Sequence, residues 1–217
     1  MNFDEGPKWN NYRPSSISPL PKPPQNKTIS KAIDTINHVS KLLALSSQLH
    51  KELVSSSVNM FHDIHERGLI KGRDTQKVSI TIIYIICRLK NIPITLDEIS
   101  KASKIPKKEI SRLQKIFSKI LNLKLPQHDL SVFLYRFSSE LELNRSTFEK
   151  SEDILRLVKK HNFDDGLSPN TVIGTVIYLA SKLEKDRRSQ ATVANVVGVS
   201  ETTIRNGFHR LNSLISQ

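Results

Sequence analysis

The stretch IIYIICRLKNIPITLDEISKASKIPKKEI at residues 82–110 recurs later in the chain as VIYLASKLEKDRRSQATVANVVGVSETTI at residues 176–204. The two stretches align without a gap at an offset of 94 residues, which pairs Tyr84 with Tyr178, Ile99 with Val193, Ile105 with Val199, and Ile110 with Ile204. Units of a solenoid repeat run about 20 to 50 residues, so an offset of this length favours two tandem helical domains.

Helical spacing continues on the N-terminal side of the repeat, and strand patterns are nearly absent. From Thr28 onward, apolar residues recur at intervals of three and four, as on one face of a helix: Ile29, Ile33, Ile36, Val39 and Leu43. Two further helices are predicted over residues 49–65 and 76–89, because Gly68 and Gly72 between them can end a helix and turn the chain. The sequence therefore predicts an all-α protein.

The chain divides into an arm and two repeats. Residues 1–27 hold six of the ten prolines and little apolar periodicity, which is typical of a flexible arm. We expect the first repeat to cover residues 28–124 and the second residues 125–217, with the joint in NLKLPQHDLS at residues 122–131. A chain of 217 residues gives each repeat enough length to form a core without disulfides or metals.

The composition points to an anionic partner. Thirty-three Lys and Arg against 21 Asp and Glu give a net charge of +12, which favours nucleic acid first and a membrane surface second. No segment approaches the roughly 20 apolar residues that span a bilayer, and the N-terminus lacks an apolar signal-peptide core, so we expect a soluble intracellular protein. Cys87, the one cysteine, excludes an internal disulfide and any zinc site with two thiolates, and its apolar surroundings predict burial.

The clearest local motif is QATVANVVGVSETTIRNGFHRL at residues 190–211, which predicts a helix-turn-helix. Gly198 can take the left-handed turn conformation, and Ser200 is a good N-cap for the second helix. On a helical wheel, four polar side chains lie opposite the apolar face: Thr202, Arg205, Asn206 and His209. Arg suits guanine, Asn suits adenine and the Thr methyl suits thymine, which favours a major-groove contact. A solvated polar face on a structural helix is the alternative.

The equivalent segment of the first repeat is strongly basic. Residues 100–124 hold eight Lys and Arg but one acid, Glu109, for a local charge of +7. Four cations fall within about 60° on a helical wheel: Lys108, Arg112, Lys115 and Lys119. This one-sided stripe favours contact with phosphates or an acidic protein over mere solubility, and we include Lys104 and Lys107 in the same contact. Because Lys104 replaces the turn glycine, we expect the first copy to read bases more weakly.

A third candidate surface is the loop RGLIKGR at residues 67–73, in which Lys71, Gly72 and Arg73 could approach DNA. A simple helix-to-helix connection is the alternative. His62 and His65 lack further ligands nearby, so we expect no metal site. No catalytic set of side chains stands out, so we expect neither an enzyme nor a cofactor.

From about Thr28 to Leu214, the chain resembles the family of archaeal transcription factor B and eukaryotic transcription factor IIB. The motifs that carry the resemblance are LIKGRD at residues 69–74, ITLDEISKASKIPKKEISR at 94–112, YRFSSELEL at 135–143, and SPNTVIGTVIYLASKLEKDRRSQATVANVVGVSETTIRN at 168–206. The resemblance implies two tandem cyclin-like domains of five helices each. It also implies binding to TATA-binding protein and to promoter DNA on both sides of the TATA element.

The resemblance assigns a partner to each of three surfaces: Thr202, Thr203 and Arg205 to a major-groove element upstream of TATA, Gly72 and Arg73 to the minor groove downstream, and Lys107, Lys108 and Arg112 to partner protein or DNA backbone. Two features depart from the family. Its N-terminal zinc ribbon, which docks on RNA polymerase, is expected to be absent because its cysteines are missing. Gly207 stands in the recognition helix where the family usually has a larger residue, at a cost of about 1 kcal/mol relative to Ala.

These features together predict a monomeric promoter-recognition factor that binds TATA-binding protein on DNA and bridges it to RNA polymerase. A regulator or competitor that occupies promoters without the ribbon is one alternative. A cyclin-like module that binds protein and does not read DNA is the other. The expected location is the cytoplasm, on the chromosome, in an archaeon, or the nucleus in a eukaryote.

Overall fold

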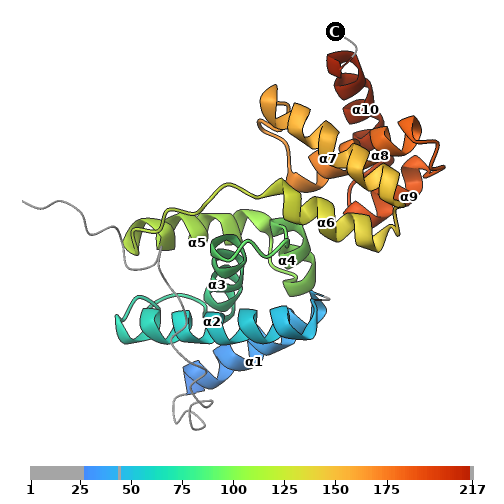
Figure 1. Ribbon diagram of the computed structural model, residues 1–217. Coiled ribbons are helices and arrows are strands. Elements are labelled where there is room, and N and C mark those ends of the chain that lie inside the picture. The colour runs from blue at the N-terminus through green and yellow to red at the C-terminus, as the bar shows by residue number, and fades with distance from the viewer. Residues whose placement is uncertain (1–26, 44, 216–217) are drawn as a thin grey trace, which may run out of the picture. The chain divides into compact units, whose positions relative to one another are not determined.

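A computed structural model describes residues 27–43 and 45–215, which form ten α-helices and no strand (Figure 1). The prediction of an all-α protein is confirmed. The arm predicted at residues 1–27 lies outside the described residues, except for Lys27, with which the first helix begins. None of the described helices is both long enough and apolar enough to cross a membrane. The chain separates into two compact units between Gln127 and His128.

The first unit holds five helices: α1 (Lys27–Leu42), α2 (Ser47–Glu66), α3 (Thr75–Leu89), α4 (Leu96–Ser103) and α5 (Lys107–Ile120). Helix α3 is the centre of this unit, where it contacts the other four (Figure 1). Every residue from Val78 to Cys87 is buried, so this part of α3 is enclosed around its whole circumference. The predicted burial of Cys87 is confirmed, and the helices predicted over 49–65 and 76–89 match α2 and α3 to within two residues.

The second unit repeats this arrangement with α6 (Leu130–Glu140), α7 (Arg145–Lys160), α8 (Pro169–Leu183), α9 (Gln190–Val197) and α10 (Glu201–Ile215). Helix α8 takes the central place and contacts the other four helices. Each residue from Val172 to Ser181 is buried. The core of each unit is therefore built around one central helix that is buried along most of its length.

The offset of 94 residues is also a property of the backbone. Helices α8 and α9 begin and end 94 residues after α3 and α4. Four left-handed residues of the first unit recur at the same offset: Gly68 with Asn162, Gly72 with Gly166, Asn91 with Lys185, and Lys104 with Gly198. A left-handed conformation is costly for residues other than glycine, so its retention at the same places shows that both copies need the same turns.

Candidate nucleic-acid interface

The segment from α9 to α10 forms the predicted helix-turn-helix. Gly198 ends α9 in the left-handed conformation, with φ 73° and ψ 35°. The backbone N–H groups of Gly198 and Val199 both donate to the carbonyl of Ala194, at 2.9 and 3.0 Å. Ser200 then caps α10, because its hydroxyl accepts the N–H of Thr203 at 3.1 Å. The turn is therefore closed by its own backbone and by the residue that starts the second helix.

The helix-turn-helix packs against helix α8. A Cβ atom on Gly174 would lie 2.7 Å from Ile204 Cδ1 and 2.9 Å from Val197 Cγ2, so α8 must lack a side chain there. A Cβ atom on Gly207 of α10 would lie even closer to the side chain of Thr175. A glycine in α10 therefore has a packing reason that its low helix propensity does not reveal. Gly174 was not identified from the sequence, although a glycine inside an apolar helical segment often indicates close packing of another helix.

The outer face of α10 is open to solvent. Thr202, Arg205, Asn206 and His209 are all exposed, as the helical wheel predicts. Thr203, which the family resemblance placed in the same group, is half-buried, and its hydroxyl lies 2.8 Å from that of Ser200. The geometry thus brings the other four side chains together on one face and directs Thr203 to the N-terminal cap.

Arg205 makes a side-chain hydrogen bond to the neighbouring helix α9. Its Nε donates to Oε1 of Gln190 at 3.5 Å, which brings the first residue of α9 beside the exposed face of α10. Beneath this face, Phe208 packs edge-on against Tyr178 of α8, with ring centroids 5.3 Å apart. The apolar side of α10 therefore packs on the central helix α8, and its polar side faces solvent.

Helix α5 carries the cationic stripe, which we define as Lys108, Arg112, Lys115 and Lys119. All four side chains are exposed, and no carboxylate of residues 27–43 or 45–215 lies within ion-pair distance of any of them. The one acid of the segment, Glu109, is paired with Lys77. The stripe therefore has no counter-ion within the part of the chain that the structure describes.

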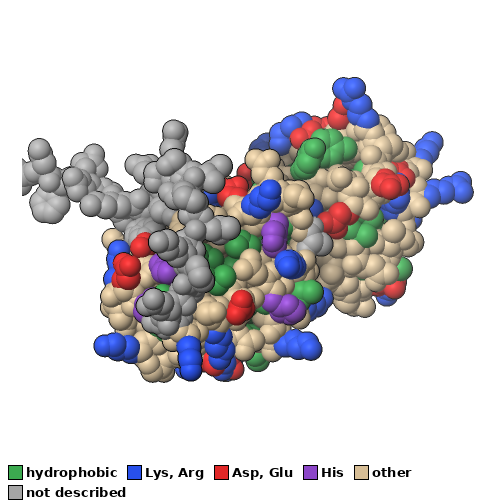
Figure 2. Space-filling model, turned by 90° about the horizontal axis from the view of Figure 1, so that it is seen from below, with side chains coloured by type: hydrophobic (Ala, Val, Ile, Leu, Met, Phe, Trp, Pro, Cys, Tyr) green, Lys and Arg blue, Asp and Glu red, His purple; other side chains and the backbone are tan. Residues whose placement is uncertain are grey.

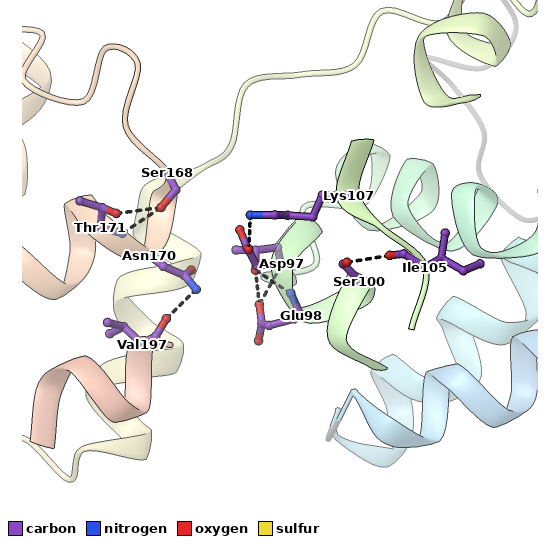
Figure 3. Close-up of polar contacts among 10 residues, drawn as sticks. Asp97, Glu98, Ser100, Ile105, Lys107, Ser168, Asn170, Thr171 and Val197 are labelled. Carbon is purple, nitrogen blue, oxygen red and sulfur yellow. Dashed lines mark hydrogen bonds and ion pairs between the residues drawn. The ribbon is translucent and has the colours of Figure 1, made fainter. Parts of the chain in front are cut away.

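The two remaining lysines of this surface differ from the stripe. Lys107 pairs with Asp97 of α4 at 2.6 Å (Figure 3). Lys104 occupies the left-handed turn position, with φ 58° and ψ 20°, which is the counterpart of Gly198. In contrast to the one-sided stripe, Lys, Arg, Asp, Glu and His side chains intermingle on the face of the first unit shown in Figure 2.

The loop between α2 and α3 has the two glycine turns that the sequence predicts, with φ of 68° at Gly68 and 73° at Gly72. Lys71 and Gly72 are exposed. Arg73 is also exposed, but its Nη1 donates to the carbonyl of Leu69 at 2.7 Å and its guanidinium carbon lies 6.0 Å from the centre of the Phe117 ring. The Arg73 side chain is therefore held by the loop backbone and by the Phe117 ring.

The corresponding loop of the second unit has the same turns but the opposite charge. Asn162 and Gly166 have positive φ at the same offset, but Asp165 stands in place of Lys71 and Asp164 adds a second acid. The two loops thus have the same backbone turns but opposite charges, so they attract different ligands. An acidic loop repels phosphate.

Metal-ligating side chains do not gather anywhere in the described part of the chain: no group of three or more His, Cys, Asp or Glu could hold an ion there. The ring of His65 stacks against Phe61, with centroids 6.5 Å apart. Burial raises the pKa of the Cys87 thiol, and the nearby Glu98 carboxylate raises it further. Cys87 is therefore a neutral core residue.

Comparison with known proteins identifies both units. The model of the transcription factor TFIIB repeat matches the chain twice, over residues 25–120 and 123–213. Proteins named transcription initiation factor IIB are similar along most of the chain. The one from Ignicoccus hospitalis is 30% identical over 192 residues, which cover 88% of this chain and 60% of the relative.

Two further relatives carry the same name. The one from Methanothrix thermoacetophila is 34% identical over 85% of this chain and 54% of its own length. The one from Methanococcus maripaludis strain S2 is 32% identical over 85% of this chain and 53% of its own length. The chain thus spans between half and two thirds of these relatives. With two matching repeats, ten helices in two equivalent units and this similarity, the chain belongs to the transcription factor TFIIB family.

Proposed function

We propose that this chain is a transcription initiation factor that binds the complex of TATA-binding protein with promoter DNA and helps to recruit or position RNA polymerase. Relatives that bear the name transcription initiation factor IIB support this proposal. The observation that carries it is the exposed face of α10, where Thr202, Arg205, Asn206 and His209 project from a helix-turn-helix. Their side chains match the hydrogen-bonding groups and methyls of base edges in a major groove.

The other two surfaces would position the protein on the duplex. The stripe on α5 suits a row of phosphates, because four cations on one helix face, without an ion-pair partner among the described residues, can displace condensed counter-ions. Lys104 and Lys107 are assigned to the same contact with phosphate or an acidic partner. Lys71, Gly72 and Arg73 are assigned to the minor groove, where the two glycine turns let the backbone approach closely. Phosphate contacts of this kind fix orientation, while α10 supplies sequence preference.

The proposal includes no catalytic step. It treats the chain as a monomer that acts on the chromosome, in the cytoplasm if the source is an archaeon. One repeat presents a limited surface, so binding to DNA alone should be weak and binding with TATA-binding protein should be strong.

The test is a gel-shift titration on a TATA promoter, with and without TATA-binding protein, at two salt concentrations. We expect a supershifted ternary complex whose affinity falls steeply with salt. Arg205→Ala should lose preference for the upstream sequence, whereas Arg145→Ala should keep it, because Arg145 lies on α7 and is paired with Glu149. Absence of a ternary complex at low salt would overturn the proposal.

A further inference from the structure

We propose that Asn170 is a positioning residue: through its hydrogen bond to Val197, it fixes the placement from which α10 presents Arg205 to DNA. This inference rests on the proposed function. It concerns a residue of the central helix that touches no DNA itself. Asn170 is the second residue of α8, is only 5% exposed, and lies behind the helix-turn-helix.

The bond joins the start of α8 to the turn of the motif. Nδ2 of Asn170 donates to the carbonyl oxygen of Val197 at 2.6 Å (Figure 3). Val197 is the last residue of α9, so its carbonyl is one of the four that have no donor within their own helix. The N–H groups of Gly198 and Val199 are already committed to Ala194. Asn170 is thus the side chain that satisfies the end of α9.

Val197 is held from a second side by the same helix. Gly174 lies one turn after Asn170 on α8, and a Cβ atom on it would overlap the side chains of both Val197 and Ile204. Ile204 is fully buried and directly precedes Arg205. The turn and the first part of α10 are therefore seated on one face of α8. A small displacement at Val197 would be transmitted through Gly198 and Ser200 to the exposed side chains of α10.

The hydrogen bonding of Asn170 is incomplete, which argues against a purely stabilising role. Its Oδ1 is buried and finds no hydrogen-bond partner among the described residues. A desolvated acceptor without a partner lowers stability, so this amide is not the side chain that stability alone would select. What the amide provides is a directional bond to one carbonyl, and a directional bond specifies the position of the turn.

The first unit lacks this connection. The counterpart of Asn170 is Gln76, which is exposed and whose side chain makes no hydrogen bond with the described residues. Its turn is closed locally instead. Ser100 Oγ donates to the carbonyl of Ile105 at 2.6 Å (Figure 3), and the N–H of Ile105 donates to Ser103 Oγ at 3.3 Å. The tie from the central helix to the turn therefore occurs in the copy that carries the polar, base-reading face and not in the cationic copy.

The test compares Asn170→Leu with the matched variant Gln76→Leu. Leucine has the same branched arrangement of side-chain heavy atoms as asparagine and cannot donate to Val197. Ternary complexes with TATA-binding protein are titrated on two promoters that share the TATA element and differ only in the upstream sequence. We expect Asn170→Leu to reduce the ratio of the two affinities by about tenfold, near the low end for loss of one base contact, with the affinity for the scrambled promoter unchanged. Gln76→Leu should change neither affinity.

A second measurement is independent of DNA. Hydrogen exchange of the backbone amides from Val199 to Arg205 should become at least about fivefold faster in Asn170→Leu, while exchange in α3 stays the same. If the leucine variant does not fold, Asn170→Ser is judged by the same two criteria. Asn170→Gln, which retains a donor, should restore part of the discrimination.

The outcomes separate this inference from the function on which it rests. If wild type shows no upstream preference, base reading by α10 fails, and hydrogen exchange alone decides whether Asn170 positions the turn. If wild type discriminates and Asn170→Leu discriminates equally well, the inference is overturned. An equal loss of affinity on both promoters also overturns it, because that result would mean that Asn170 only stabilises the fold.

Discussion

Gly207 of α10 lies so close to Thr175 of α8 that a methyl group on Gly207 would overlap the threonine hydroxyl. Thr175 is fully buried, and the contact lies where α10 of the helix-turn-helix packs against α8. At the equivalent positions the first unit has Leu113 and Thr81, so a buried leucine side chain stands where α10 has none. The two copies therefore pack their last helix against the central helix in different ways.

This contact predicts that Gly207→Ala destabilises the protein. In a solvated helix the change would add about 1 kcal/mol of stability, because alanine is the better helix former. Here the overlap with Thr175 costs about 1 to 3 kcal/mol, so we expect a net loss of unfolding free energy of about 1 kcal/mol. Urea denaturation measures it. The same change in a Thr175→Ala background should be less harmful, and a gain of stability in the wild-type background would contradict the packing.

The left-handed turn residues predict opposite effects at two equivalent sites. Lys104 has φ 58°, a conformation that costs a non-glycine residue about 1 kcal/mol, so Lys104→Gly should raise the free energy of unfolding by about that amount. Gly198→Ala should lower it by a similar amount. Lys101→Gly is the matched control, since it also removes one positive charge but lies inside α4 and should lower stability by about 1 kcal/mol. Thermal denaturation of the three variants decides.

Much of the fold could be predicted because its signals are local or repeated. The apolar spacing of α1 to α3, the turn glycines and the ungapped repeat each depend on neighbours in the sequence. The exposed face of α10 and the stripe on α5 followed from helical periodicity in the same way. The charge of the stripe could be counted directly, because none of its members has a distant partner among the described residues.

What could not be predicted depends on contacts between distant segments. Asn170 and Val197 are 27 residues apart, and no local pattern indicates that one would cap the other. Gly207 reads as a weak point in a helix until its contact with Thr175 is known. Arg73 reads as a free cation, although Leu69 and Phe117 hold it. In each case a tertiary contact decides the role of a residue whose type and position were already visible.

The buried thiol predicts a dependence of stability on pH. Because burial raises the pKa of Cys87, the folded state keeps its proton at pH values where the unfolded thiol, with a pKa near 8.5, loses it. The contribution of the protonated, buried thiol to the free energy of unfolding is therefore complete below about pH 8 and declines as the pH rises. Between pH 8 and 10, wild type should lose about 1 to 2 kcal/mol more unfolding free energy than Cys87→Ala. Parallel pH profiles for the two proteins would contradict the assignment of a neutral, buried thiol.

The stripe on α5 predicts a change in the salt dependence of DNA binding. Each cation that contacts a phosphate contributes about 0.9 to the slope of log affinity against log salt concentration. Replacing Lys108, Arg112, Lys115 and Lys119 by Gln should therefore lower the slope of ternary-complex formation by about 1 for each side chain that meets DNA, equally on all upstream sequences. Gel-shift titrations over a range of salt concentrations measure the slope.

The control for the stripe uses cations that are exposed but already paired. Arg145 and Arg156 of α7 are held by Glu149 and Asp153, so their replacement by Gln should leave the slope unchanged. A direct binding assay with TATA-binding protein in the absence of DNA distinguishes the other use of the stripe. If the four-residue variant loses that binding while its slope on DNA stays at the wild-type value, the stripe meets an acidic protein surface, and the phosphate assignment is wrong.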